Sequence, residues 1–437
     1  MKRLAAPLLA AFVAFVGTFS VPAAYADEPR VDVDESTSNL DAFTSNQRVS
    51  GVMRANYFRS SKTFDADTDF LGATVQIKAL PSLGKDLDGK LELRLTHPDL
   101  GGSAKTRGRL LEGYVTIHFE SADLRIGKQI VAWGRADGIN PTDNLTPRDY
   151  AVMLPFEDDQ RFGTVAVKLD ASLSRDHTLT VFASPFFAPS KIPLPAVGPT
   201  VVEKAPARTL SNTEVGLKLN AVGEGLDWSV SYFRGFSLLP GMRLVSDGPA
   251  RPALELHYDR ITALGADFAR NYGRFGLRGE VVYINTADRR GIDPSVKNPY
   301  LYWIAGVDRT FLDNLNVNLQ FFQRRIRRYH DPEAIADPVA RGIAIKGAIV
   351  GGQQDRLSNG ISFRVSNKWL NDTLEAEIFS AVNFTRDNSF TRLLLSYAFS
   401  DHWKGTVGAD VYRGPTDTQF GSLKANRGAF AELRYGF

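Results

Sequence analysis

Apolar and polar residues alternate along the chain in segments of about ten residues, which are separated by turn-forming residues. In one such segment Leu71, Val75 and Ile77 fall on one face and Gln76 and Lys78 on the other, because successive side chains of a β-strand point to opposite sides. Similar segments lie at residues 91–96, 111–119, 214–219, 374–378 and 403–411. The repeated alternation predicts many β-strands, each with one apolar and one polar face.

Strands of a soluble β-sandwich also alternate, so further features must distinguish a sandwich from a membrane barrel. The predicted connections alternate in length, with short turns at 121–123, 271–273 and 400–402 between long loops at 134–162 and 325–358. Outer-membrane barrels have short periplasmic turns and long external loops. Aromatic residues also gather at the predicted strand ends, as in the interfacial girdles of such barrels. Both features favour the membrane barrel.

The chain ends inside an alternating segment. Glu432 and Arg434 fall on its polar face, whereas Tyr435 and the terminal Phe437 fall on its apolar face. This terminus resembles the C-terminal signal by which the barrel-assembly machinery recognises outer-membrane proteins. The resemblance implies that Tyr435 and Phe437 act as an assembly signal and that the machinery is a partner of this chain.

Counting the alternating segments from about residue 50 predicts a single antiparallel transmembrane β-barrel of about 18 strands, within a range of 16 to 18. An even number places both ends of the barrel in the periplasm. The predicted barrel covers residues 50–437, and only the region 234–260 is ambiguous in its strand pattern. Residues 27–49 are acidic and polar, and we expect them to form a periplasmic tail or a small plug.

The first 26 residues have the pattern of a secretory signal peptide. Lys2 and Arg3 precede an apolar run, and Ala24 and Ala26 flank the predicted cleavage site. A retained membrane anchor is the alternative, although Pro7 and other breakers interrupt the run. Later residues contain no stretch of about 18 apolar residues, so any membrane span must consist of strands. The sequence thus predicts a protein of the bacterial outer membrane.

Charge and cysteine content exclude several classes of protein. The formal charge of the whole chain is +3, and removal of Lys2 and Arg3 with the signal peptide leaves +1. This balance gives no indication of nucleic-acid binding. The chain has no cysteine, so thiolate metal sites and cysteine nucleophiles are excluded. We predict no metal site and no cofactor.

A barrel of 16 to 18 strands leaves an aqueous lumen unless a loop enters it. Arginines at a constriction would favour an anionic or hydroxyl-rich solute, because a guanidinium offers a fork of donors. Alternatively, cross-strand ion pairs stabilise the inner wall without selecting any solute. The residues predicted to line the pore are Arg54, Lys78, Arg94, Arg125, Arg278, Arg364, Arg392, Arg434, Glu112, Glu280, Glu375 and Glu377.

The segment 133–150 is the most distinctive loop, because turn residues and charges of both signs alternate in it. Long loops often carry function, and we expect this one to fold inward and narrow the pore. The alternative is an external cap held by its own Asx turns. The residues predicted at the constriction are Trp133, Arg135, Asp137, Asp143, Arg148 and Asp149.

The sequence around this loop resembles a strand-and-loop fingerprint of a broad group of proteobacterial outer-membrane proteins, similar in architecture to the alginate-export porins. The resemblance is carried by residues 125–129, 133–134 and 140–143. It implies an 18-stranded porin-like channel for export of a polysaccharide or uptake of a small organic solute. With the charged inner wall, we predict a channel for passive passage of a polar or anionic solute or for export of a polysaccharide. Within this fingerprint Lys128 is predicted to face lipid, which a β-bulge or contact with a neighbouring subunit would explain.

Two other classes of function are compatible with a barrel. A receptor or adhesin would have a blocked lumen and use the external loops as its binding surface. An outer-membrane hydrolase would require a nucleophile with a positioned base, but none of the six histidines stands in a recognisable catalytic spacing. We therefore predict no enzyme and no catalytic residues. The expected partners are outer-membrane lipid and a small-molecule or polysaccharide substrate, whereas the oligomeric state is left open.

Overall fold

The computed structural model describes residues 48–60, 69–102, 105–151, 157–193, 200–246, 252–312 and 314–437. The predicted signal peptide and nearly all of the predicted tail at 27–49 lie outside these residues.

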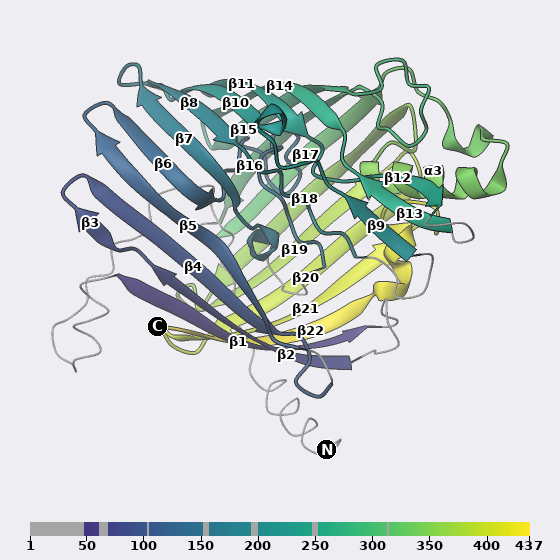
Figure 1. Cartoon of the computed structure of the whole chain (residues 1–437). Helices are drawn as coiled ribbons and strands as arrows, with labels where there is room; N and C mark the ends of the chain where they lie inside the picture. Colours follow the sequence, from purple (N-terminus) through teal and green to yellow (C-terminus); the bar gives the residue numbers. More distant parts are fainter. Residues whose placement is uncertain are drawn as a thin grey trace, which may run out of the picture.

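The described chain forms a closed antiparallel barrel of 18 strands, as the alternating segments predicted (Figure 1). The strands are β1 (Val49–Ser60), β2 (Asp69–Ala79), β4 (Leu87–His97), β5 (Arg107–Phe119), β6 (Ala122–Gln129), β7 (Thr164–Ser172), β8 (His177–Ser184), β10 (Glu214–Ala221), β11 (Asp227–Phe236), β14 (Arg260–Tyr272), β15 (Phe275–Thr286), β16 (Tyr300–Phe311), β17 (Leu315–Ile326), β18 (Leu357–Trp369), β19 (Leu374–Asn383), β20 (Asn388–Ala398), β21 (Trp403–Arg413) and β22 (Gly428–Gly436). Each strand pairs with the next one along the barrel.

The first and last strands close the barrel. β1 and β22 pair in a regular register from Val52 opposite Gly436 to Ser60 opposite Gly428. Beyond the last pair, the Phe437 N–H donates to the Gly51 carbonyl at 3.0 Å, and the Gly51 N–H donates to the Phe437 carbonyl at 2.8 Å. Because an unsatisfied backbone group in lipid costs several kcal/mol, a sheet in a membrane must close in this way.

The connections differ in length between the two ends of the barrel. Short turns such as 120–121 and 273–274 join strands at the periplasmic end, whereas loops such as 130–163, 185–213 and 327–356 join them at the external end. The predicted alternation of short and long connections is therefore confirmed.

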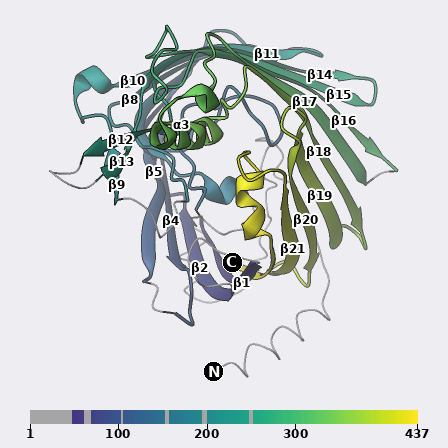
Figure 2. The same cartoon turned by 90° about the vertical axis from the view of Figure 1, so that its right-hand side faces the viewer.

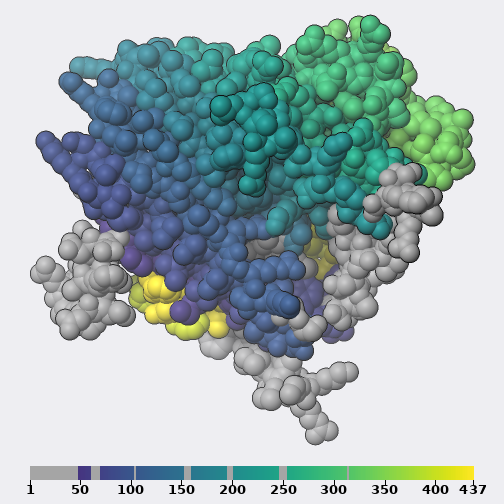
Figure 3. All heavy atoms as spheres, in the orientation of Figure 1, coloured from purple at the N-terminus to yellow at the C-terminus, as the bar shows by residue number. Residues whose placement is uncertain are grey.

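Apolar side chains cover the outside of the barrel, and charged side chains are buried inside it. Ile77, Leu93 and Leu393 on the outer face are between 41% and 44% exposed, whereas Glu280 and Glu375 are 3% and 1% exposed. This distribution is the reverse of that in soluble proteins. The apolar outer wall therefore faces lipid. Figure 3 shows the part of the outer surface that β4 to β8 form.

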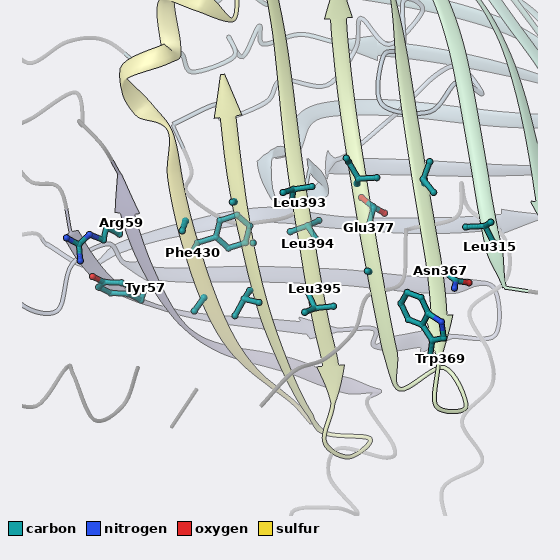
Figure 4. A pocket seen from close by; sticks show the side chains of 18 residues that line it. Tyr57, Arg59, Leu315, Asn367, Trp369, Glu377, Leu393, Leu394, Leu395 and Phe430 are labelled. Atoms are coloured by element: carbon teal, nitrogen blue, oxygen red, sulfur yellow. The ribbon is translucent and has the colours of Figure 1, made fainter. Parts of the chain in front are cut away.

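The outer wall contains one broad apolar hollow of about 880 Å³ across β18 to β22 and β1 (Figure 4). Small side chains such as Ala376, Ala409 and Ala431 line it, and Trp369 and Leu393 border it. Because these side chains alternate with the inward-facing ones, the hollow opens toward lipid and not toward the lumen.

Simple alternation failed at one position of β5. The register of β4 and β5 shifts between Glu92 and Leu93, which leaves Leu111 as an extra residue in a β-bulge. The alternation of the segment 111–119 would put Leu111 on the apolar, lipid-facing side, but it is only 2% exposed. The bulge considered for Lys128 is not seen there, because that residue lies in a regular ladder between Gly113 and Val165.

The remaining elements lie mainly at the external end. Three strands, β9 (Thr200–Lys204), β12 (Gly241–Ser246) and β13 (Pro252–His257), form a separate small sheet, which explains the ambiguous pattern of region 234–260. β3 (Ser82–Gly84) only extends a periplasmic turn. The short 3₁₀ helices are η1 (Glu157–Gln160), η2 (Leu210–Asn212), η3 (Pro332–Ala334) and η4 (Gly421–Asn426).

One α-helix, α3 (Pro338–Gly351), lies at the mouth of the barrel, beyond the strand ends in Figure 1 and across the opening in Figure 2. Asp337 caps its start by accepting from the Ala340 N–H at 2.6 Å. Gly352 ends it in the left-handed conformation with a φ of 63°. Within the described residues, no helix is both long and apolar enough to cross a membrane.

A charge in the middle of the lipid-facing wall should destabilise the barrel. Leu393 lies midway along β20 and faces outward, so Leu393→Lys should lower the free energy of unfolding in lipid vesicles by about 2–4 kcal/mol. Leu312 lies in a periplasmic turn and is 89% exposed, so Leu312→Lys serves as the matched control. Denaturant titration followed by tryptophan fluorescence measures both, and equal effects would contradict a lipid-facing Leu393.

Candidate functional site

The loop 130–163, between β6 and β7, folds into the barrel and reaches the opposite wall. Its first half contacts the inward faces of β14, β15 and β18, and its second half contacts β1 and β4. In Figure 2 the blue end of this loop lies inside the ring of strands. The sequence predicted an inward fold for this loop, and its contacts are therefore the candidate site.

Apolar side chains anchor the start of the loop to the inner wall. Trp133, which is 5% exposed, packs with Leu145 of the same loop against Phe182 of β8 and Phe233 of β11. Gly216 of β10 makes room for the indole, because a Cβ there would lie 2.9 Å from the Trp133 ring. Thr146 ties the two halves of the loop together, since it donates to the Val131 carbonyl at 2.6 Å.

Glu280 of β15 fixes the turn of the loop. Its carboxylate accepts from the backbone N–H groups of Arg135 and Ala136, the latter at 2.6 Å, and from the Thr142 hydroxyl at 3.0 Å. Gly134 adopts a φ of 95°, and a Cβ there would lie 2.5 Å from the Glu280 carboxylate. Only glycine can therefore bring the backbone this close to the acid.

Ion pairs join the next part of the loop to two more strands. The Arg135 guanidinium pairs with Asp267 of β14 and donates to the Asn220 side chain at 2.7 Å. Asp137 at the tip lies 3.0 Å from Arg364 of β18, which also lies 2.9 Å from Glu377 of β19. The tip thus spans the interior from β6 to β18.

The second half of the loop is held by arginines of the wall. Asp159 of η1 lies 2.5 Å from the Arg54 guanidinium and 3.1 Å from that of Arg94. Asp149 lies 2.7 Å from Arg109 of β5. All three wall arginines therefore meet an acid of the loop.

Within the loop itself, Asp143 pairs with Arg148 at 3.3 Å and with Arg161 at 2.7 Å. The two predicted constriction residues Asp143 and Arg148 therefore contact each other.

Of the predicted pore residues, Arg364 contacts the predicted loop residue Asp137, and Glu280 contacts Arg135. Arg54 and Arg94 instead meet Asp159, and Glu377 meets Arg364.

The other predicted pore residues meet the loop at single points or lie apart from it. Glu112 accepts from the Ile130 N–H at 2.8 Å. Arg278 donates to the Arg135 carbonyl at 3.4 Å and pairs with Asp308 at 3.3 Å. Arg125 lies over the Tyr114 ring at 4.4 Å.

Four predicted pore residues belong to other parts of the wall. Arg392 pairs with Asp410 at 2.6 Å. Arg434 lies opposite Arg54 and Lys404, Lys78 opposite Ser50 and Glu92, and Glu375 opposite Lys368 and Ser396.

Four acids or arginines of the site were absent from the predicted set, namely Asp267, Asp159, Arg109 and Arg161. Asp267 stands on a strand whose other inward residues are small or apolar, such as Ala263, so its segment showed little polar pattern. Asp159 and Arg109 gave no local signal, because their partners are distant in the sequence.

A second cavity of about 390 Å³ lies outside the lumen, between α3, η3 and loop 287–299. Lys297 stands at its edge and donates to the Ser237 hydroxyl at 2.8 Å and the Leu239 carbonyl at 2.7 Å. Burial of its ammonium group lowers the pKa of Lys297 to about 7. Arg324 of β17 donates to the Gly352 carbonyl at 2.7 Å and so fixes the end of α3. Among the described residues, no cluster of three or more His, Asp or Glu side chains could hold a metal.

A family model described as "Protein of unknown function (DUF1302)" matches residues 34–371. The chain belongs to this family. No curated protein matches the DUF1302 chain. Among solved structures, OccAB4 of Acinetobacter baumannii is similar with a TM-score of 0.53 and 9% identity, covering 89% of this chain and 97% of that one. OccK5 (OpdH) of Pseudomonas aeruginosa is similar with a TM-score of 0.51, 9% identity and the same coverage of 89% and 97%.

These similarities agree with the architecture of the barrel. The DUF1302 chain has the fold of outer-membrane porins, and its apolar outer wall and polar interior are those of a bacterial outer-membrane protein. The predicted resemblance to alginate-export porins stays a prediction.

Removing the Glu280 carboxylate should loosen the loop. Glu280→Ala leaves several buried N–H and O–H donors without an acceptor, which should cost at least about 2 kcal/mol. Amide hydrogen exchange of residues 131–142 should become roughly thirtyfold faster. Glu375→Ala removes another buried inward acid, on β19, and should leave this exchange unchanged. Equal protection in the Glu280 variant and the native protein would show that the carboxylate does not hold the loop.

Proposed function

We propose that this protein is a passive channel through the outer membrane and that loop 130–163 narrows its lumen. The observation that supports this proposal is the path of the loop across the interior, from β6 to Arg364 of β18. A barrel of 18 strands is wide enough for an aqueous lumen, so its effective width depends on what enters it. In this proposal, Arg135, Asp137 and Asp149 stand at the narrowest part of the passage.

Charges at this narrowing suggest a polar or anionic solute. Arg54, Arg94 and Arg364 reach the acids of the loop from three different strands. Guanidinium groups remain charged and present fork-shaped donors to carboxylates and hydroxyls. Their pairing with Asp159 and Asp137 also holds the loop. In this proposal the same arginines therefore position the loop and select the solute.

For assembly, we propose that Tyr435 and Phe437 are read by the barrel-assembly machinery. The Tyr435 ring lies 4.9 Å from that of Trp403, and Phe437 adds a further backbone pair beyond the closing strands. A terminus built into the closure of the barrel would link recognition to the last step of folding.

Removal of the loop tip tests the channel proposal. Deletion of residues 137–149, with the ends joined by a short Gly-Ser linker, should raise the single-channel conductance in a planar lipid bilayer severalfold. The expected reason is that the tip no longer crosses the lumen between β6 and β18. Steady ohmic current from the native protein is the first requirement of this experiment.

Deletion of residues 200–212 is the matched control, because it removes the same number of residues from a loop that carries part of the external sheet. That variant should keep the native conductance. An electrically silent native protein would favour a receptor or an enzyme instead. A conducting protein with unchanged current after the tip deletion would remove the loop from the path.

A further inference from the structure

One arc of the inner wall carries a cluster of aromatic side chains. Phe58 of β1 stacks on Phe70 of β2 with 5.4 Å between ring centroids, and it lies 5.5 Å from Phe430 of β22. Phe58 and Phe430 point inward, because they share faces with Arg54 and Glu432, which meet inside the barrel near η1. The first cluster therefore faces the lumen.

A second aromatic cluster follows on the neighbouring strands. Phe390 of β20 lies 5.0 Å from Tyr412 of β21 and 6.3 Å from Phe379 of β19. Phe420, from the loop that contains η4, lies 6.1 Å from Phe390. Together the two clusters form an aromatic arc, which lines the inner wall from β19 through β22 to β2.

Two arginines stand on the rings of the aromatic arc. The Arg392 guanidinium lies 5.5 Å from the centre of the Phe390 ring and 5.8 Å from that of Phe430, so it bridges both clusters. Arg364 lies 5.1 Å from the centre of the Phe379 ring. Asp410 and Glu377 hold the two guanidinium groups in place. Each guanidinium, together with its paired carboxylate, is thus fixed directly against apolar surface.

The position of the loop leaves this arc beside the proposed passage. At one end of the arc, the loop tip abuts Phe379, since a Cβ on Gly138 would lie 3.0 Å from that ring. At the other end, Asp159 meets Arg54 and Arg94. The opposite apolar arc, which includes Phe182 and Phe233, is covered by the start of the loop. The contacts described here between the loop and the strands at or next to the aromatic arc therefore lie at its two ends.

Phe430 and Phe379 are buried, with 5% and 8% exposure, whereas the half-buried rings present apolar surface beside the proposed passage, namely Phe58, Phe70, Phe390 and Tyr412. Apolar surface in contact with water is unfavourable and needs an explanation. Aromatic rings bind flat or apolar bodies, and a guanidinium on the same surface binds a carboxylate. We propose that the aromatic arc is a binding track for an organic anion with an apolar body. This inference rests on the proposed channel function and narrows its substrate class.

Phenylacetate is the probe for this track, and acetate and phenethylammonium are its comparisons. In a planar bilayer, the half-blocking concentration of phenylacetate for the native protein should be at least about threefold lower than that of acetate or phenethylammonium. Acetate lacks the apolar body, and phenethylammonium carries the opposite charge. Equal block by all three solutes would overturn the proposal.

Two substitutions locate the block on the aromatic arc. Phe390→Leu keeps an apolar side chain but removes the ring, and Arg392→Gln removes the charge. Each should raise the half-blocking concentration of phenylacetate about threefold to tenfold while potassium chloride conductance persists. Phe268→Leu, on the lipid-facing side of β14 and 44% exposed, is the matched control and should not change the block.

The outcomes separate the two proposals. If the native protein carries no salt current, the channel proposal fails and the track with it. If it conducts but neither arc variant shifts the block, only the track is wrong. If phenylacetate blocks the Phe420→Ala variant but not the native protein, the η4 loop itself occupies the arc. This result also overturns the proposed track.

Discussion

The closed ladder of backbone hydrogen bonds is the constraint on which the rest of this structure depends. In the acyl region no water can satisfy a free N–H or carbonyl, so the pairing of β1 with β22 is required before any outer wall can exist. Closure then fixes the two faces of every strand. Apolar residues such as Leu393 must face lipid, and charged residues such as Glu280 must face inward.

The same requirement governs the loop inside the barrel. A chain that leaves the sheet at β6 exposes backbone groups that the ladder no longer satisfies. Glu280 accepts from the N–H groups of Arg135 and Ala136, and Thr146 receives the N–H of Val131. The inner wall and the loop's own side chains thus supply hydrogen-bond acceptors to the loop backbone, as neighbouring strands do for one another. A loop held in this way keeps a defined position in the lumen.

The fold was predictable because its signal is local. Each strand shows its faces within about ten residues, so the strand count and the alternation of turns and loops followed from sequence. The bulge at Leu111 was not predictable, because it depends on the register with β4. The site was only partly predictable for the same reason. Arg54 and Asp159 are 105 residues apart, and Asp137 and Arg364 are 227 apart, and no local pattern encodes such pairs.

The two apolar regions of the inner wall differ in what accompanies them. Around Phe182 and Phe233, Trp133 and Leu145 of the loop complete a packed core, as in a soluble protein. The rings from Phe379 to Phe58 are instead accompanied by Arg392 and Arg364, which a simple core would exclude because burying charge beside apolar groups is costly. Arginines on rings suit a surface that binds a solute with both a charged group and an apolar body. The loop's contacts at both ends of this arc connect the position of the loop to the choice of solute.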